Sequence, residues 1–139
     1  MGLEIDLHVK FCADWGLGEA AMEALPESVE TMAYTRFVLE KGLAGDLLDL
    51  HVALAPCIIG YAEIGRALTP SNVSNPYAAW IDMYASEEYQ SIATSEIKQL
   101  DRLFGLRAGE GRFGVLSKTF AQATQLEAAF WQMGLNAAD

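Results

Sequence analysis

A thiol and a phenol stand four residues apart in the apolar segment 54–68, where Cys57 is followed by Tyr61. In an α-helix this spacing places both side chains on one face. Cysteine is a strong nucleophile, and a tyrosine beside it can donate or accept a hydrogen bond. A buried cysteine and a hydrogen-bonded tyrosine are also ordinary features of helical cores, so both interpretations stay open. The apolar stripe expected to face the bundle consists of Leu47, Leu50, Leu54, Cys57, Tyr61, Ile64 and Leu68.

Pro56 directly precedes this thiol. Proline lacks an amide hydrogen, and its ring collides with the carbonyl four residues earlier, so helices usually bend at such a position. We therefore expect a kink at the carbonyl of Val52, just before Cys57, and a gap between helices at that depth. Gaps between the helices of a bundle are common places for ligands.

A second reactive group is Glu127, which lies in the middle of the apolar stripe of the segment 113–133. Burying an unpaired carboxylate is costly, so such a group either finds a partner, such as a tyrosine hydroxyl or a helix end, or holds a proton. A protonated carboxylic acid can act as a general acid. We therefore predict that Cys57 and Glu127 face the same interior space.

The elements that must position these groups are helices, because apolar residues recur at spacings of three and four along nearly the whole chain. Helix starts are expected at Pro26, Asp46 and Ser86, and helix ends are expected at Gly42 and Gly134. Residues 1–139 are therefore expected to form a single all-α bundle. The pattern predicts helices at about 3–15, 26–42, 46–68, 75–84, 86–104 and 113–133, with a short helical turn at 18–25.

Composition limits the partners of this chain. Nine Lys and Arg against nineteen Asp and Glu give a formal charge of −10, which disfavours nucleic acid and membrane surfaces. No apolar run reaches the roughly 18 residues that a membrane span requires. Hydrophobic residues make up 52% of the chain, so we expect another subunit or a missing part of the domain to cover some apolar faces.

The cysteines and histidines indicate a reducing compartment and no metal site. Cys12 and Cys57 form neither a CxxC pair nor a zinc spacing, and His8 and His51 are too few for a complete metal centre. No signal peptide is evident at the start of the chain. We therefore expect free thiols in a cytoplasmic protein.

Four separated segments resemble the TenA family of thiaminase II-type aminopyrimidine hydrolases. They are, in order, ETMAYTRFVLEKG, LAPCIIGYAEIG, PYAAWIDMYASEEY and LEAAFWQMG, and the resemblance extends from about Glu4 to Gly134. It implies an all-α bundle like that of heme oxygenase, usually assembled as a tetramer. It also implies a reaction that needs no metal or organic cofactor.

The resemblance implies roles for five residues. Cys57 corresponds to the family's nucleophile, Tyr61 to its hydrogen-bonding tyrosine, and Glu127 to the glutamate that exchanges protons with the pyrimidine ring. Tyr34 and Tyr84 correspond to aromatic residues that line the pyrimidine pocket. The implied reaction adds the thiolate to an electron-poor ring carbon and expels ammonia from an aminomethylpyrimidine, or the thiazole from thiamin. Water then yields hydroxymethylpyrimidine, which implies a role in thiamin salvage.

The family is typically longer at the amino end, where earlier helices contribute an aspartate and a stacking aromatic residue. We therefore expect an N-terminally shortened bundle, in which no residue takes those two roles. The chain is then a fragment, the partner of a second chain that supplies the missing helices, or a shortened member. A shortened member would bind pyrimidines or regulate without catalysis. A metal-dependent oxidase on a heme-oxygenase-like bundle is a further alternative, against which the histidine count argues.

Overall fold

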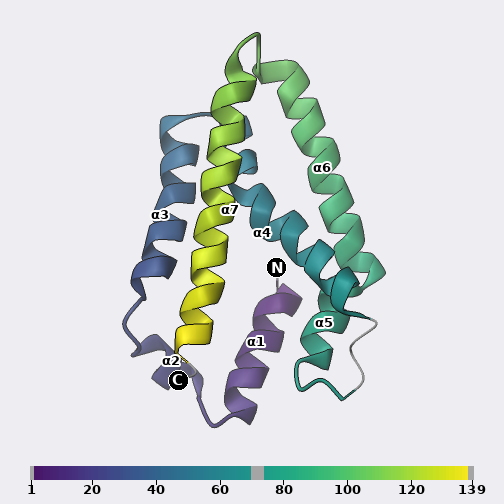
Figure 1. Ribbon diagram of the computed structural model, residues 1–139. Helices are drawn as coiled ribbons and strands as arrows, with labels where there is room; N and C mark the ends of the chain where they lie inside the picture. Colours follow the sequence, from purple (N-terminus) through teal and green to yellow (C-terminus); the bar gives the residue numbers. More distant parts are fainter. Residues whose placement is uncertain (1, 70–73, 138–139) are drawn as a thin grey trace.

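The computed structural model describes residues 2–69 and 74–137, which form helices and no strand (Figure 1). The predicted all-α architecture is confirmed, and each predicted helix is present with shifted ends. The helices are α1 (Gly2–Asp14), α2 (Glu19–Glu23), α3 (Val29–Ala44), α4 (Leu47–Leu68), α5 (Ala78–Ala85), α6 (Glu87–Arg107) and α7 (Arg112–Asn136).

Helix α4 is the central element, because it packs against α3, α5, α6 and α7. Helices α3 and α7 lie side by side, and α4 crosses the bundle at an angle to them (Figure 1). Helix α1 lies at the end of the bundle opposite the α6–α7 turn. The contacts of α4 with α6 and α7 enclose a hydrophobic core, whose buried members are Leu48, Val52, Leu103, Ala108 and Leu116.

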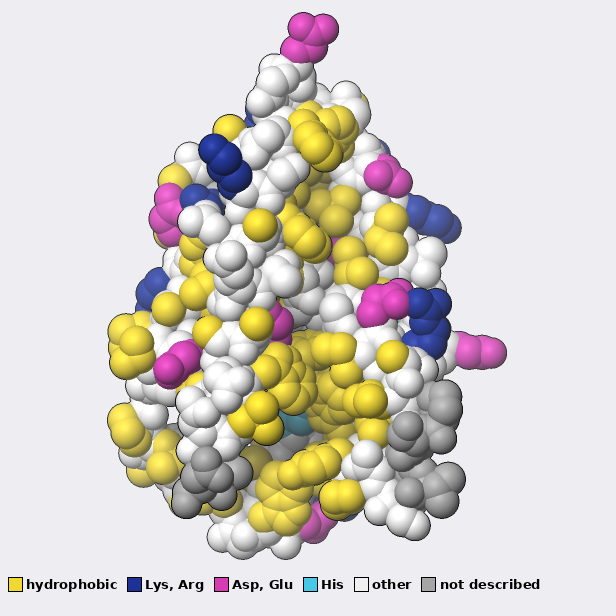
Figure 2. All heavy atoms as spheres, viewed as in Figure 1, with side chains coloured by type: hydrophobic (Ala, Val, Ile, Leu, Met, Phe, Trp, Pro, Cys, Tyr) yellow, Lys and Arg dark blue, Asp and Glu magenta, His cyan; other side chains and the backbone are white. Residues whose placement is uncertain are grey.

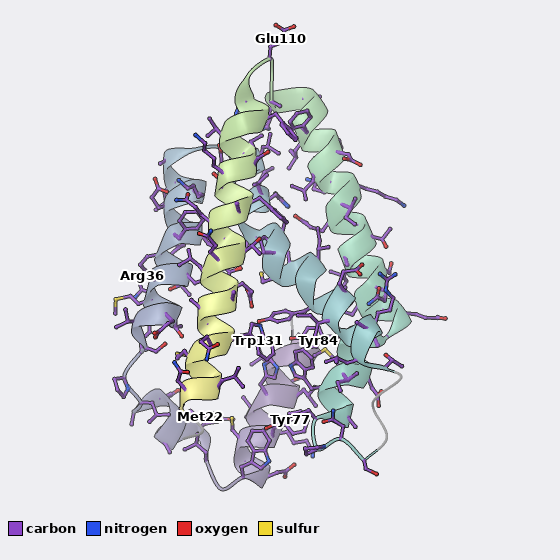
Figure 3. All side chains as sticks on the ribbon, viewed as in Figure 1. Met22, Arg36, Tyr77, Tyr84, Glu110 and Trp131 are labelled. Carbon is purple, nitrogen blue, oxygen red and sulfur yellow. The ribbon has the colours of Figure 1, made fainter. Side chains whose placement is uncertain are left out.

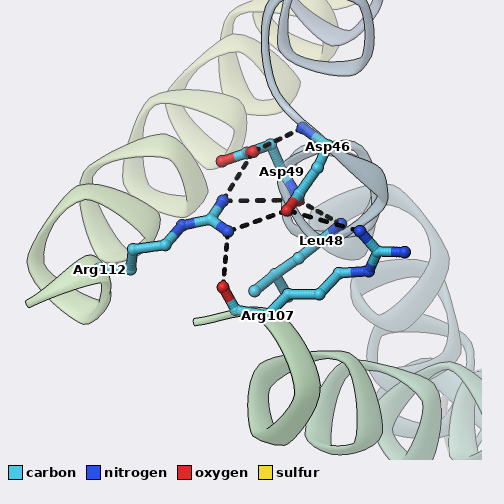
Figure 4. A network of polar contacts seen from close by, with 5 residues as sticks. All are labelled: Asp46, Leu48, Asp49, Arg107 and Arg112. Atoms are coloured by element: carbon cyan, nitrogen blue, oxygen red, sulfur yellow. Dashed lines mark hydrogen bonds and ion pairs between the residues drawn. The ribbon is translucent and has the colours of Figure 1, made fainter. Parts of the chain in front are cut away.

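A capping network fixes the start of α4 beside the start of α7 (Figure 4). The Asp46 carboxylate accepts hydrogen bonds from the amides of Leu48 at 2.9 Å and Asp49 at 3.3 Å, and the Asp49 carboxylate accepts one from the Asp46 amide. Arg112 donates to Asp46 at 3.0 Å and to Asp49 at 2.7 Å. It also donates to the carbonyl of Arg107. The predicted cap at Asp46 is thus confirmed, and it ties three helices together.

The helix ends predicted at Pro26, Gly42 and Gly134 are wrong. Helix α3 begins at Val29 and not at Pro26, because the Ser28 hydroxyl accepts a hydrogen bond from the Thr31 amide and caps the helix there. Helix α3 continues past Gly42 to Ala44, and α7 continues past Gly134 to Asn136. Glycine ends a helix when its backbone adopts a positive φ, and neither Gly42 nor Gly134 is among the positive-φ glycines.

The buried face of α4 differs from the predicted stripe. Leu47, Ile64 and Leu68 are more than a third exposed, and Cys57 and Tyr61 are half-buried. Small residues bring neighbouring helices close to α4: a Cβ on Gly65 would lie 2.8 Å from Tyr84. The buried residues of α4 are Leu48, Val52, Ala53, Ala55, Pro56, Ala62 and Gly65.

Within the described ranges, α4 alone is long and apolar enough to cross a membrane by length and composition. Its central position accounts for this composition, because four helices pack around it. Large hydrophobic side chains also remain exposed elsewhere, among them Leu43 at 86% and Val29 at 77% on α3. The expectation that another subunit or segment covers such faces stays a prediction.

Candidate active site

Three helices bring Tyr34, Cys57, Tyr61 and Glu127 to one small hollow of about 140 Å³. Tyr34 comes from α3, Cys57 and Tyr61 from α4, and Glu127 from α7. The predicted convergence of the thiol and the carboxyl group on one space is therefore present in the structure. The volume is roughly that of four or five waters at about 30 Å³ each, which suits one small ring.

Glu127 is held through one of its two oxygens. The Tyr61 hydroxyl donates to Glu127 Oε1 at 2.6 Å, so the buried carboxyl group has found the tyrosine partner that the sequence left as one alternative. Its other oxygen, Oε2, is buried without a hydrogen-bond partner in the described part of the chain. The hydroxyl of Tyr34 is buried without a partner in the same way.

Buried polar atoms usually find a partner, and an orphaned atom calls for an explanation. Here two such atoms come from residues that line the same hollow beside the Cys57 sulfur. A ligand that placed one hydrogen-bonding group against Tyr34 and another against Glu127 would satisfy both. The site therefore has unsatisfied hydrogen-bonding capacity for a polar ligand.

The Cys57 thiol is held in its neutral form. Burial raises the pKa of Cys57 above its ordinary value of 9.0, and the nearby negative charge of Glu127 raises it further. The thiol donates to the Leu54 carbonyl at 3.1 Å. Helix α4 runs unbroken through Pro56, which offers no amide to the Val52 carbonyl. The kink expected there stays a prediction, although the hollow beside Cys57 is present.

Both tyrosines of the hollow stay protonated at neutral pH. Burial raises the pKa of Tyr34, and the neighbouring Cys57 is the second cause. Burial also raises the pKa of Tyr61, and its hydrogen bond to Glu127 adds to the effect. Both hydroxyls therefore remain hydrogen-bond donors.

Tyr84 does not line this hollow. It is 1% exposed, and its ring lies 5.1 Å from that of Tyr61 and 4.5 Å from that of Trp80, measured between centroids. Figure 3 shows Tyr84 and Trp131 near one another between α5 and α7. The structure thus places Tyr84 behind Tyr61, and its predicted contact with a ligand stays a prediction.

Sequence reasoning missed several neighbours of the site. Phe130 and two threonines, Thr31 and Thr35, also line the hollow. The spacing of these threonines around Tyr34 is helical, which could have placed them on the same face of α3. His51 and Glu96 form a separate polar pair between α4 and α6, with Nδ1 2.7 Å from Oε1. No periodic signal predicted that pair.

Among the described residues, no three His, Cys, Asp or Glu side chains are grouped as a metal site. The hollow at Cys57 brings several reactive side chains together. It holds a sulfur nucleophile, a carboxyl group with one free oxygen, and two phenolic donors.

Comparison with known proteins identifies the family. The model of the TENA/THI-4/PQQC family matches residues 1–137. This chain belongs to that family.

Similar proteins include one with a named activity. An uncharacterized protein of Haemophilus influenzae is 40% identical over 138 residues, and the match covers 97% of this chain and 64% of the relative. An aminopyrimidine aminohydrolase of Halalkalibacterium halodurans is 35% identical over 140 residues, with 98% and 62% covered. The match to both relatives thus spans a little under two thirds of their length.

The helical TenA fold is confirmed by a solved structure. A TenA family transcription regulator from a Silicibacter species superposes with a TM-score of 0.89 at 45% identity. The match covers 95% of this chain and 61% of that protein.

Proposed function

We propose that this chain carries the central part of an aminopyrimidine hydrolase site, in which Cys57 is the nucleophile and Glu127 transfers protons. The observation that carries the proposal is the shared hollow, where the Cys57 sulfur lies with two unpartnered buried atoms, Tyr34 Oη and Glu127 Oε2. An aminopyrimidine presents a ring nitrogen next to an amino group. Those neighbouring groups are an acceptor and a donor, which suits the two unpartnered atoms.

The proposed reaction begins with proton transfer from Cys57. Because the thiol is neutral at rest, its proton must leave before the sulfur can attack, and Glu127 Oε2 is the free acceptor in the hollow. The sulfur then forms a bond to an electron-poor ring carbon, and Glu127 returns the proton to a ring nitrogen. Tyr61 holds the other carboxyl oxygen and so fixes the direction of Oε2.

The remaining steps restore the ring. The electron pair of the interrupted ring expels the group on the exocyclic methylene, which leaves as ammonia or as a thiazole. The leaving group departs neutral, because the amine is protonated and the thiazolium carries a positive charge. Water adds to the methylene carbon and releases one proton to solvent. The ring nitrogen gives its proton to Glu127, the carbon–sulfur bond breaks with its electron pair on sulfur, and Glu127 passes that proton to the sulfur. The products are hydroxymethylpyrimidine and the regenerated thiol, so the proposed metabolic role is thiamin salvage.

The test is hydrolysis by the purified chain of an aminomethylpyrimidine and, separately, of thiamin. We expect turnover by the wild type, and a loss of at least about a hundredfold in Cys57→Ala and Glu127→Gln, because each removes a group that reacts. Glu63→Gln is the matched control, since Glu63 lies exposed on α4 and pairs with Arg66. Equal rates in the wild type and Cys57→Ala would refute the enzymatic proposal for this chain.

A second candidate is a pyrimidine-binding regulator without catalysis. It is favoured by the 45% identical structure, which is described as a transcription regulator. The formal charge of −10 argues against direct contact of this chain with DNA. Tight binding of hydroxymethylpyrimidine with no turnover of either substrate would support this alternative over the hydrolase.

A further inference from the structure

Tyr61 and Glu127 form a wall between two hollows. On one side lies the hollow of about 140 Å³ at Cys57. On the other side lies a hollow of about 360 Å³ between α4 and α7, which Tyr61 and Glu127 also line. Trp131 lines this second hollow, and the described residues that line the hollow at Cys57 do not include it. A ring bound beside Cys57 would therefore contact the wall and not Trp131.

Trp131 approaches the wall from the same helix as Glu127. The two residues lie four positions apart on α7, so their side chains share a face of that helix. Figure 3 places Trp131 between α7 and α5, and Figure 2 shows hydrophobic side chains gathered in a recess beside this part of α7. The ring centroids of Trp131 and Tyr61 are 5.9 Å apart, with planes at 68°. In packed aromatic clusters the indole N–H usually finds a hydrogen-bond partner.

The Tyr61 hydroxyl can serve as that partner. It has one hydrogen to donate and lone pairs that accept, and the hydrogen goes to Glu127 Oε1 at 2.6 Å. Burial is the main cause of the raised pKa of Tyr61, the hydrogen bond to Glu127 adds to it, and a hydrogen bond from Trp131 opposes it. An indole N–H at the lone pairs excludes the hydroxyl hydrogen from that side and so directs it at Glu127. It also polarises the O–H bond, which strengthens the contact with the carboxyl group.

We propose that Trp131 is a positioning residue of the proposed hydrolysis, whose N–H holds the Tyr61 hydroxyl against Glu127 Oε1 and so keeps Oε2 available in the hollow at Cys57. The inference rests on the proposed function, because the place of Oε2 matters for catalysis only if Glu127 transfers protons. Trp131 acts through Tyr61 and not on the substrate. Its N–H therefore contributes to the chemical step and little to substrate binding.

The NMR signal of the Trp131 indole N–H tests the hydrogen bond without any turnover. The chain has three tryptophans, and Trp131→Phe identifies the signal of Trp131 by removing it. Tyr61→Phe keeps the ring and removes only the oxygen that accepts. We expect this substitution to move the Trp131 signal upfield, because the N–H loses its acceptor, and to leave the signal of Trp15 in place. An unmoved Trp131 signal would overturn the inference.

A double-mutant cycle tests the role in the reaction. Trp131→Phe keeps an aromatic ring and loses the N–H, so we expect kcat to fall about fivefold to tenfold, the size of one hydrogen bond, with KM nearly unchanged. In the Tyr61→Phe background the same substitution should cost little, because the hydroxyl through which Trp131 acts is absent. An equal loss in both backgrounds would show that Trp131 only packs, and a raised KM at unchanged kcat would show that it binds substrate. Either result would overturn the positioning role.

Trp80→Phe is the matched control. Trp80 also contacts Tyr61 edge-on, with the same centroid distance of 5.9 Å, so its substitution removes an indole of equal size from the same ring. We expect its effect on kcat to be the same in both backgrounds, and coupling as large as that of Trp131 would refute the assignment. A wild-type chain that hydrolyses neither substrate would refute the hydrolase and the catalytic role of Trp131 together. An active chain with an unmoved Trp131 signal, or without coupling, would refute the positioning role alone.

Discussion

At the scale of single residues, the site depends on how burial changes the reactivity of Cys57. Cysteines that react rapidly at neutral pH usually have a lowered pKa and a positive neighbour. Cys57 has the opposite environment, because burial and the negative charge of Glu127 both raise its pKa. A base in the site must therefore remove the proton of the thiol. In the proposed reaction, Glu127 acts first as this base and only afterwards as an acid.

This environment predicts an alkaline dependence for chemical modification of Cys57. Its rate of alkylation by iodoacetamide should still rise above about pH 9, because only the thiolate reacts and the pKa exceeds the ordinary value of 9.0. Glu127→Gln should move this rise to lower pH, since the substitution removes a negative charge and retains the burial. Mass spectrometry of the Cys57 peptide measures the rate, with the Cys12 peptide in the same sample as a reference. A rate that levels off below about pH 8 would contradict the prediction.

At the scale of helices, the sequence best predicted the features that depend on residues close together in the chain, such as helix caps. Asp46 and Ser86 cap their helices as predicted, because a cap joins a side chain to amides only two or three residues away. Pro26 misled the prediction, since Ser28 offers a hydroxyl cap at the next compatible position. Gly134 also misled it, because glycine permits a helix end and does not require one.

The site itself was only partly predictable for the same reason. Stripe positions could place Cys57 and Glu127 on inward faces of two helices, since this needs only helical periodicity. They could not show that Tyr61 donates to Glu127 across 66 residues, or that Tyr84 lies behind Tyr61. Those contacts depend on how closely α4 approaches α5 and α7, and small residues such as Gly65 set that distance.

The Asp46 carboxylate both caps α4 and pairs with Arg112, and two substitutions can separate these functions. Asp46→Ala removes the acceptor for the helix amides and the partner of Arg112, and should reduce the free energy of unfolding by about 1–2 kcal/mol. Asp46→Asn keeps a side-chain oxygen for the cap and loses the negative charge, so its loss at neutral pH should be smaller. Urea unfolding of the three proteins measures both values.

The same carboxylate should affect stability in acid. The hydrogen bond from Arg112 lowers the pKa of Asp46 from 3.8 to about 2. The folded state therefore keeps the carboxylate charged where the unfolded chain protonates it, and this contribution to stability is lost as pH falls through that interval. Asp46→Asn should lack this part of the acid dependence. A wild-type and Asp46→Asn difference that stays constant between about pH 5 and pH 2 would contradict the assignment.

At the scale of the whole molecule, composition and structure agree that apolar surface is in excess. Hydrophobic residues make up 52% of the chain, and large side chains such as Leu43, Leu39 and Val29 are exposed along α3. Composition could predict that such faces exist, because a chain of this length has limited interior. It could not locate them, since their position depends on which face of α3 packs against α4 and α7.

The thiol of Cys57 and the hydroxyls of Tyr34 and Tyr61 should together make the folded state less stable in alkali. Burial raises the pKa of Cys57, Tyr34 and Tyr61, so the unfolded chain releases these protons at a lower pH than the folded chain. The free energy of unfolding should therefore fall as pH rises above about 9, by up to about 1.4 kcal/mol per pH unit for each group in its interval. Urea unfolding between about pH 8 and pH 11 measures this slope. Tyr34→Phe removes one group and should make the slope above about pH 10 shallower by about 1.4 kcal/mol per pH unit. Identical slopes in the wild type and Tyr34→Phe would show that the Tyr34 hydroxyl is not buried as the structure places it.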